Sequence, residues 1–394
     1  MRYAIVSETY PPEVNGVALT VQTLECGLRA RGHQVDVVRP RQPHDGDGDG
    51  ADHETLAASL PLPRYPGLRV GLPAMRQLAA RWRVAPPAAV YVATEGPLGW
   101  SALRIARRMG IPVATGLHTR FDHYMRDYGA RWLEPVALHW MRRFHNRADA
   151  TLVPTLELTQ QLHGHGFAHV ERLPRAVDSA RFDPARRDHE LRVSWGIDEA
   201  GVAAIHVGRI AAEKNLDLAV AAYRRMQQAL RQQGRPEPRF VWVGDGPARA
   251  ALERANPDFI FCGTQRGDAL ARYFASGDLF VFPSRSETFG NVTLEAMASG
   301  VPTVAFNYGA AREHLQDGLH GAAVTDGDDE AFVAATRRVA LDVPMRAAMG
   351  ALARAAIAHL RPEQVTTDFE ALLIRMVERR KHASSNVAQA PFGR

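Results

Sequence analysis

The stretch from residue 279 to residue 304 restricts most strongly what this chain can fold into. Its apolar run at residues 279–282 predicts a buried strand, and residues 293–298 predict the opening of a helix. A turn that contains Gly290 separates the two. In such a strand–turn–helix unit, backbone N–H groups and the positive end of the helix dipole point to one place, which favours the binding of an anion.

Strands and helices alternate along the rest of the chain. Residues 3–6 predict a strand, residues 18–31 a helix and residues 34–38 a second strand, which together form a βαβ unit. Residues 203–207 predict a further strand that leads into Gly208. This order indicates an α/β protein. The first unit lacks the glycine motif G-x-G-x-x-G that is typical of dinucleotide-binding proteins.

The length of 394 residues is too great for one core and predicts two domains. Hydrophobic residues make up 46% and charged residues 23% of the chain, as in soluble globular proteins. The sequence has no apolar run of about 18 residues that could span a membrane and no signal-peptide pattern at its start. Cys26 and Cys262 lie in apolar surroundings, so we expect buried free thiols in a reducing cytoplasm.

Arginines are concentrated in the first half of the chain. Nine arginines and only three acidic residues occur from residue 104 to residue 147. This excess favours an anionic partner such as phospholipid headgroups or a phosphorylated acceptor, although a general preference for arginine over lysine explains it equally well. Residues 132–144 have helical apolar spacing, which favours core packing over a membrane-surface helix. The sequence shows no nucleic-acid-binding motif, so we expect no nucleic acid partner.

Two cations follow the strand predicted at residues 203–207. Arg209 stands directly after Gly208, and Lys214 follows five positions later at a helix start. An arginine binds phosphate oxygens through two parallel hydrogen bonds, whereas a lysine acts as a point charge. The pair predicts a site for a diphosphate. By contrast, the Gly/Asp-rich residues 44–53 lack the spacing of an EF-hand and predict an exposed loop without a metal ion.

Several of these segments resemble the retaining glycosyltransferases of family 4, which have the GT-B fold. Residues 282–304 resemble the E-x7-E signature of that family, with Glu287 and Glu295 as its two glutamates. Residues 208–214 resemble its G-R-x4-K motif, in which the cations hold the diphosphate of a donor.

Two further segments in the first half of the chain support the resemblance. Residues 11–16 resemble the P-P-x-x-G-G loop of the family, with Asn15 where the first glycine often stands. Residues 118–121 resemble its H-T-x-F motif, whose histidine contacts the transferred sugar. The resemblance extends over nearly the whole chain.

The resemblance implies two Rossmann-like domains with an interdomain cleft. Residues 1–180 are expected to form the acceptor-binding domain and residues 181–361 the donor-binding domain. A C-terminal helix at about residues 362–381 is expected to cross back to the first domain.

The resemblance also implies roles for individual residues. Catalytic roles fall to His118, Arg209, Lys214 and Glu287. Donor-binding roles fall to Gly16, Gly208, Arg209, Lys214, Gly244, Cys262, Gly263, Phe289, Gly290, Asn291 and Glu295. Thr119, Arg120 and Tyr124 belong to the acceptor side. The family generally works without a metal ion, and no D-x-D motif adjoins the sugar site, so we expect neither a metal nor a cofactor.

The function that the resemblance implies is transfer of a hexose from a nucleotide-diphosphate sugar to an acceptor hydroxyl. The opening segment and residues 116–124 look most like α-mannosyltransferases and glycolipid-forming members. We therefore favour GDP-mannose as donor, a lipid or lipid-linked sugar as acceptor, and peripheral association with the inner face of the cytoplasmic membrane. A UDP-hexose-dependent glycolipid glycosyltransferase is the close alternative. A nucleotide-sugar epimerase of the GT-B fold and a non-catalytic nucleotide-sugar binder remain open from other classes.

Overall fold

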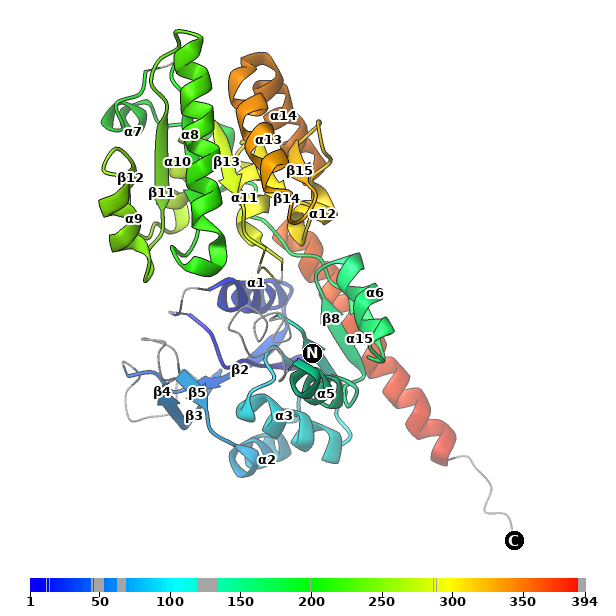
Figure 1. Cartoon of the computed structure of the whole chain (residues 1–394). Helices are drawn as coiled ribbons and strands as arrows, with labels where there is room; N and C mark the ends of the chain where they lie inside the picture. The colour runs from blue at the N-terminus through cyan, green and yellow to red at the C-terminus, as the bar shows by residue number, and fades with distance from the viewer. Residues whose placement is uncertain are drawn as a thin grey trace. The chain divides into compact units, whose positions relative to one another are not determined.

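The computed structural model describes residues 1–11, 13, 15–43, 45, 53–61, 69–118, 134–198, 200–285, 287 and 289–388, the last six of these without their side chains. The chain divides into two compact units (Figure 1). Unit 1 comprises Met1–Ala176 together with Pro362–Arg394, and unit 2 comprises Val177–Arg361. The boundary that the sequence predicts at residue 180 lies close to this division.

Unit 1 is built on a parallel sheet of seven strands in the order β3-β2-β1-β6-β7-β8-β9. These strands are β1 (Arg2–Val6), β2 (Gln34–Pro40), β3 (Glu54–Ala57), β6 (Ala89–Val92), β7 (Val113–Gly116), β8 (Ala150–Val153) and β9 (Val170–Arg172). The helices are α1 (Gly16–Ala30), α2 (Met75–Val84), α3 (Pro97–Arg108), α5 (Glu134–His145), α6 (Leu156–Gly164) and α15 (Pro362–Ala388). A short antiparallel pair, β4 (Ser59–Pro61) and β5 (Arg69–Gly71), completes the described elements.

Both faces of this sheet are covered by apolar side chains, as parallel sheets require. Along β1, Tyr3 and Ile5 belong to one core cluster, while Ala4 and Val6 belong to another. The C-terminal helix α15, red in Figure 1, contributes Phe369 to the first of these clusters, together with residues of α1. The prediction that the last helix returns to the first domain is therefore confirmed, and the helix runs beyond residue 381 to Ala388.

Unit 2 has a parallel sheet of six strands in the order β12-β11-β10-β13-β14-β15. They are β10 (Ala203–Val207), β11 (Arg239–Val243), β12 (Ile260–Phe261), β13 (Leu279–Phe282), β14 (Thr303–Phe306) and β15 (Gly321–Val324). The α-helices are α7 (His189–Ser194), α8 (Leu216–Gln232), α9 (Arg249–Ala255), α10 (Gly267–Ser276), α11 (Asn291–Ala298), α12 (Ala310–His314), α13 (Asp329–Leu341) and α14 (Val343–Ala356). Two 3₁₀ helices are η2 (Pro184–Arg186) and η3 (Ala212–Lys214). Alternate residues of β13 again divide between two cores, with Phe280 in one and Val281 in the other.

Two parallel sheets with helices on their faces confirm the predicted α/β class. One prediction about the interior is wrong, however. Cys26 is exposed. Helix α1 buries Val21, Leu24 and Leu28 on its core-facing side, and Cys26 lies on the opposite side of the helix. Cys262 is half-buried, and both thiols are free. None of the described helices is long and apolar enough to cross a bilayer.

Candidate functional site

The sequence-predicted donor residues of unit 2 follow the carboxyl ends of neighbouring strands. Gly208 and Arg209 follow β10, Gly244 follows β11, and Glu287 follows β13. Because the strands are parallel and adjacent, these segments gather at one edge of the sheet. The strand order reverses between β10 and β13, and ligands of open α/β sheets bind outside the strand ends at such a switch point.

An ion pair spans this switch point. The Lys214 ammonium, at the end of η3, donates a short hydrogen bond to Oε1 of Glu287. The Ser284 hydroxyl donates to the same carboxylate oxygen over 2.9 Å. The side chains of Lys214 and Glu287 are only 16% and 21% exposed, so their attraction is weakly screened by water. The sequence predicted both residues, and the fold brings them together across 73 positions of the chain.

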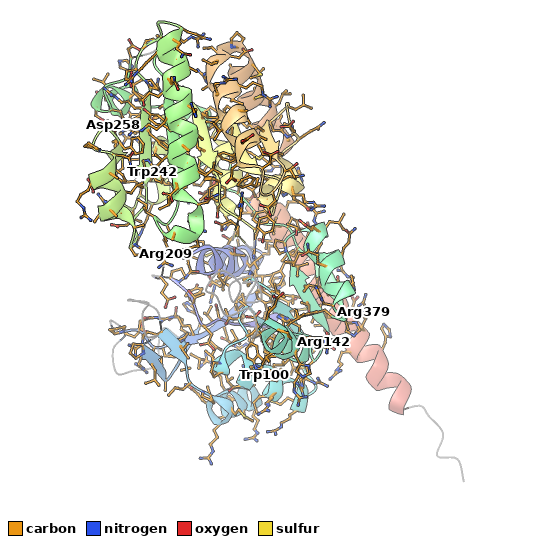
Figure 2. The ribbon with its side chains drawn as sticks, in the orientation of Figure 1. Trp100, Arg142, Arg209, Trp242, Asp258 and Arg379 are labelled. Atoms are coloured by element: carbon orange, nitrogen blue, oxygen red, sulfur yellow. The ribbon has the colours of Figure 1, made fainter. Side chains whose placement is uncertain are left out.

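Arg209 is the more accessible of the two predicted phosphate-binding cations. Its side chain is 47% exposed, and its guanidinium lies 3.6 Å from the carboxylate of Glu213, which belongs to η3. Figure 2 shows Arg209 at the same end of unit 2 as the start of α8. A guanidinium that is half exposed at the strand ends can be reached by the oxygens of a phosphate.

Glycines allow the strand ends to approach each other. Gly244 has φ 144°, and a Cβ placed there would lie 1.9 Å from the carbonyl oxygen of Gly208. Its amide donates to the carbonyl of Gly263 over 2.8 Å, which joins the loop after β11 to the loop after β12. In that second loop, the Cys262 carbonyl accepts a hydrogen bond from Gln265, and burial raises the pKa of the Cys262 thiol. The predicted donor residues of these two loops are therefore neighbours.

The turn before α11 presents backbone donors. Gly290 has φ 90°, in the left-handed region that favours glycine, and precedes the first helical residue, Asn291. The amides of a first helical turn have no partner within the helix and attract an anion. Phe289 is buried, 5% exposed, and fixes the turn on the core of unit 2. The predicted strand, turn and helix start are therefore present, and the binding of an anion at this turn stays a prediction.

Glu295 lies on the second turn of α11, and burial raises the pKa of its carboxyl to about 7. Within the described part of the chain, its side chain makes no hydrogen bond or ion pair. A half-buried carboxylate without a partner is costly, and it gains stability when ligand hydroxyls donate to it. This environment suits a carboxylate that binds hydroxyl groups.

In unit 1, Gly16 is the first residue of α1 and is exposed. The Asn15 side chain caps the helix, because its Oδ1 accepts hydrogen bonds from the amides of Val17 and Ala18 over 3.1 and 2.9 Å. The asparagine that replaces the family's glycine therefore has a structural role. The N-terminus of α1 follows strand β1, so it lies at the carboxyl edge of the sheet.

His118 follows β7 at the same edge, but its imidazole is buried, with 8% of the residue exposed. Its Nε2 lies 2.7 Å from the Tyr91 hydroxyl, and its Nδ1 is in short contact with the Arg175 guanidinium. Burial lowers the pKa of His118 well below its ordinary value, and the positive charge of Arg175 adds to this effect. Tyr91 and Arg175 were not among the residues predicted for the site; the position of Arg175 just after β9 is the signal that points to it.

Two groups of predictions remain: those for residues outside the described ranges, and the expectation that the protein binds no metal ion. Thr119, Arg120 and Tyr124 lie outside the described residues, as does most of the Gly/Asp-rich stretch 44–53. Among the described residues, no three His, Cys, Asp or Glu side chains are grouped as a metal ion would require.

The sequence matches two known family descriptions. Residues 14–181 match "Glycosyltransferase Family 4", and residues 202–342 match "Glycosyl transferases group 1". A GDP-mannose-dependent alpha-mannosyltransferase of Mycolicibacterium smegmatis is 35% identical over 319 residues, which cover 79% of this chain and 81% of that protein. An alpha-monoglucosyldiacylglycerol synthase of Streptococcus pneumoniae is 26% identical, with 82% and 75% covered.

The fold has solved counterparts. The sucrose-phosphate synthase of Thermosynechococcus elongatus superimposes with a TM-score of 0.78 at 18% identity, over 96% of this chain and 99% of that one. This likeness and the two parallel sheets confirm the predicted fold class. The chain belongs to the family 4 glycosyltransferases and is an enzyme of the GT-B fold.

Proposed function

We propose that this enzyme transfers mannose from GDP-mannose to an acceptor hydroxyl and retains the configuration of the anomeric carbon. The observation that carries the proposal is the set of Arg209, Lys214, Glu287 and Glu295 at the switch point of unit 2. Its two cations match a diphosphate, and its two carboxylates match the hydroxyls of a nucleotide sugar. The choice of donor is supported by the name of the relative from Mycolicibacterium smegmatis.

The cations stabilise the leaving group in the proposed reaction. As the bond between the anomeric carbon and the β-phosphate oxygen breaks, negative charge grows on that oxygen, and Arg209 and Lys214 bind it. The amides at the start of α11 face the same charge. Lys214 must then exchange Glu287 for phosphate, and Glu287 accepts hydrogen bonds from the mannose hydroxyls instead. We propose that transfer needs no metal ion, because these cations and amides supply the positive charge.

The proton balance follows from the same arrangement. The acceptor oxygen forms a bond to the anomeric carbon on the face that GDP leaves, and its proton passes to the departing phosphate oxygen. Glu295 binds the ribose hydroxyls, which donate to its carboxylate. Unit 1 carries the residues predicted for the acceptor side, and the exposed N-terminus of α1 at Gly16 offers backbone donors that suit an anion.

We propose a lipid or lipid-linked sugar as acceptor and a peripheral position on the inner face of the cytoplasmic membrane. A basic aromatic surface of unit 1 supports this, made of Trp100, Arg104, Trp140, Arg143 and Arg147. Figure 2 labels Trp100 of α3, which belongs to this surface, and Arg142 of α5. The guanidinium carbons of Arg104 and Arg147 lie 5.8 and 5.4 Å from the Trp100 ring centroid, and Trp140 is 40% exposed. Burial and the positive charge of the neighbouring Arg143 lower the pKa of Arg147. An anion bound here would reduce the repulsion between these arginines.

The prediction that the helix at residues 132–144 packs into the core is correct only for the C-terminal part of α5. Met141, Phe144 and His145 are buried, whereas Val136 is 63% exposed. Exposed tryptophan among arginines suits the interface of an anionic bilayer. Binding to vesicles with and without phosphatidylglycerol tests this surface, with Trp140→Ala and Arg143→Glu as variants and Arg225→Glu of unit 2 as the charge control. Equal binding by all variants would remove the surface from the proposal.

A screen of thermal stability tests the donor. The purified enzyme is heated with GDP, GDP-mannose, UDP, UDP-glucose and ADP in the presence of a chelator. A ligand that binds only the folded state raises the Tm. A shift with the guanine compounds alone supports the proposal, and a shift with the uracil compounds supports a UDP-hexose donor. Product analysis then separates transfer from epimerisation, since an epimerase changes the donor sugar without an acceptor, and a binder without activity changes nothing.

A further inference from the structure

Three side chains of unit 1 form a buried group whose hydrogen bonds determine where a histidine carries its proton. His118 follows β7, Tyr91 lies in β6, and Arg175 lies in the segment after β9. They are 8%, 1% and 9% exposed, so bulk water does not satisfy their polar atoms. Their partners in the described structure are each other.

The direction of each bond follows from the chemistry of the donors. A guanidinium has five N–H groups and no acceptor, so the short contact of Arg175 Nη2 with His118 Nδ1 requires a lone pair on that nitrogen. A neutral imidazole carries one proton, which must then sit on Nε2. The Tyr91 hydroxyl oxygen, 2.7 Å from Nε2, accepts the hydrogen bond. A protonated His118 would instead place two N–H groups against each other at Nδ1.

The absence of a side chain at Gly116 leaves room for the Tyr91–His118 hydrogen bond. A Cβ on Gly116, the last residue of β7, would lie 2.3 Å from the Tyr91 hydroxyl oxygen and 2.5 Å from His118 Nε2. Both distances are too short for any side chain, even a methyl group. A glycine at the end of β7 is therefore a condition for the Tyr91–His118 hydrogen bond.

The charged groups around the imidazole act in the same direction. Arg175 faces it from the segment after β9, and His145 faces it from α5. Burial, Arg175 and His145 all lower the pKa of His118. Glu95 pairs with His145 Nε2 over 3.1 Å and does not contact His118 in the described structure. Helix α15 contributes an apolar ring, Phe369, against Tyr91.

We propose that Arg175 and Tyr91 are positioning residues that lock His118 as the neutral tautomer with its proton on Nε2. This inference rests on the proposed function and on the sugar-side role that the family resemblance implies for His118. The imidazole then takes no part in proton transfer, because its two nitrogens are hydrogen-bonded to Tyr91 and Arg175. The lock also fixes the point at which the chain leaves β7 for the segment that holds Thr119 and Arg120.

Nitrogen NMR of the enzyme with ¹⁵N-labelled histidine tests the lock without any substrate. Two-bond correlations distinguish a protonated ring nitrogen from one that carries a lone pair, and His118→Asn assigns the signal. We expect His118 to show one tautomer, protonated at Nε2, from about pH 5 to about pH 8. In Arg175→Met, we expect a mixture of tautomers and titration of His118 toward its ordinary range. A proton on Nδ1 in the wild-type enzyme overturns the proposal.

Kinetics separate positioning from general structural damage. We expect Arg175→Met to lower kcat roughly 10-fold and to add an acid limb to its pH profile, with an unchanged Kd for GDP because the donor residues of unit 2 are intact. Arg175→Lys keeps a donor and should restore part of kcat and the single tautomer. Arg172→Met, on the exposed end of β9, is the matched control.

If Arg175→Met keeps both the tautomer and kcat, the proposal is wrong. If the wild-type enzyme transfers no sugar at all, the proposed function fails, while the NMR result still decides whether the lock exists.

Discussion

Lys214 and Glu287, predicted to bind different parts of one donor, form an ion pair with each other. The ammonium comes from the segment after β10 and the carboxylate from the segment after β13, so the pair bridges the two strands at which the sheet order reverses. In this pair each charge is compensated by the other until a diphosphate binds the lysine more strongly than Glu287 does. Donor binding then exchanges one ion pair for another instead of burying a lone charge.

We therefore expect Lys214→Met and Glu287→Gln to affect different steps. Lys214→Met should lower kcat by about 10³-fold, because the leaving group loses its point charge. It should also leave Glu287 without its partner. Glu287→Gln should raise the affinity for free GDP, since Lys214 no longer has to leave a carboxylate, while transfer falls by at least about 10²-fold. Steady-state kinetics and calorimetric titration with GDP measure both effects. Wild-type turnover by either variant would remove that residue from the catalytic set.

Glu295 predicts a pH dependence of donor affinity. Burial raises the pKa of its carboxyl to about 7, and ribose hydroxyls that donate to the carboxylate must lower this pKa on binding. The affinity for GDP-mannose should therefore be greatest above pH 7 and should fall as the pH drops through about 7, by about 10-fold per pH unit. GDP-mannose is the suitable ligand, because its diphosphate does not titrate there as the terminal phosphate of GDP does. Calorimetry on Glu295→Gln should show weak binding with no such slope.

The same carboxyl predicts that Glu295→Gln stabilises the ligand-free enzyme at alkaline pH. Burial raises the folded-state pKa above the ordinary value of 4.5, so the folded chain holds the proton more tightly than the unfolded chain. Stability is then lost as the pH rises from about 4.5 to about 7, and the cost remains above that range. We expect the variant to gain roughly 1–3 kcal/mol of unfolding free energy at pH 8 and little at pH 5. Urea unfolding at the two pH values measures it, and an equal gain at both would contradict the prediction.

Gly244→Ala should disturb the donor loops. The added Cβ would lie 1.9 Å from the Gly208 carbonyl oxygen. Neither atom can move without its backbone, so one of the two strand ends has to shift. We expect a loss of roughly 1–3 kcal/mol of unfolding free energy and much weaker GDP binding. Gly234→Ala is the matched control, since Gly234 also has a positive φ, 64°, but no atom lies within 4 Å of its added Cβ. A control that is as damaging as Gly244→Ala would show that backbone strain, and not the contact with Gly208, is responsible.

The class of fold and the order of the elements could be predicted from the sequence alone. Apolar runs at residues 279–282 and 203–207 became β13 and β10, because a parallel sheet buried on both faces needs continuous apolar strands. The residues after those strands were correctly placed at one edge, because parallel strands end together. These inferences depend only on local pattern and on the direction of the chain.

Which side chains meet depends on how the strands are ordered in three dimensions. The partner of Lys214 lies 73 positions away, and the partner of His118 lies 57 positions away in Arg175. No local pattern marks such pairs, since each depends on how the strands are ordered in the sheet. The same holds for burial: Cys26 lies among apolar residues in the sequence but is exposed on α1, because the face that a helix buries is set by what packs against it.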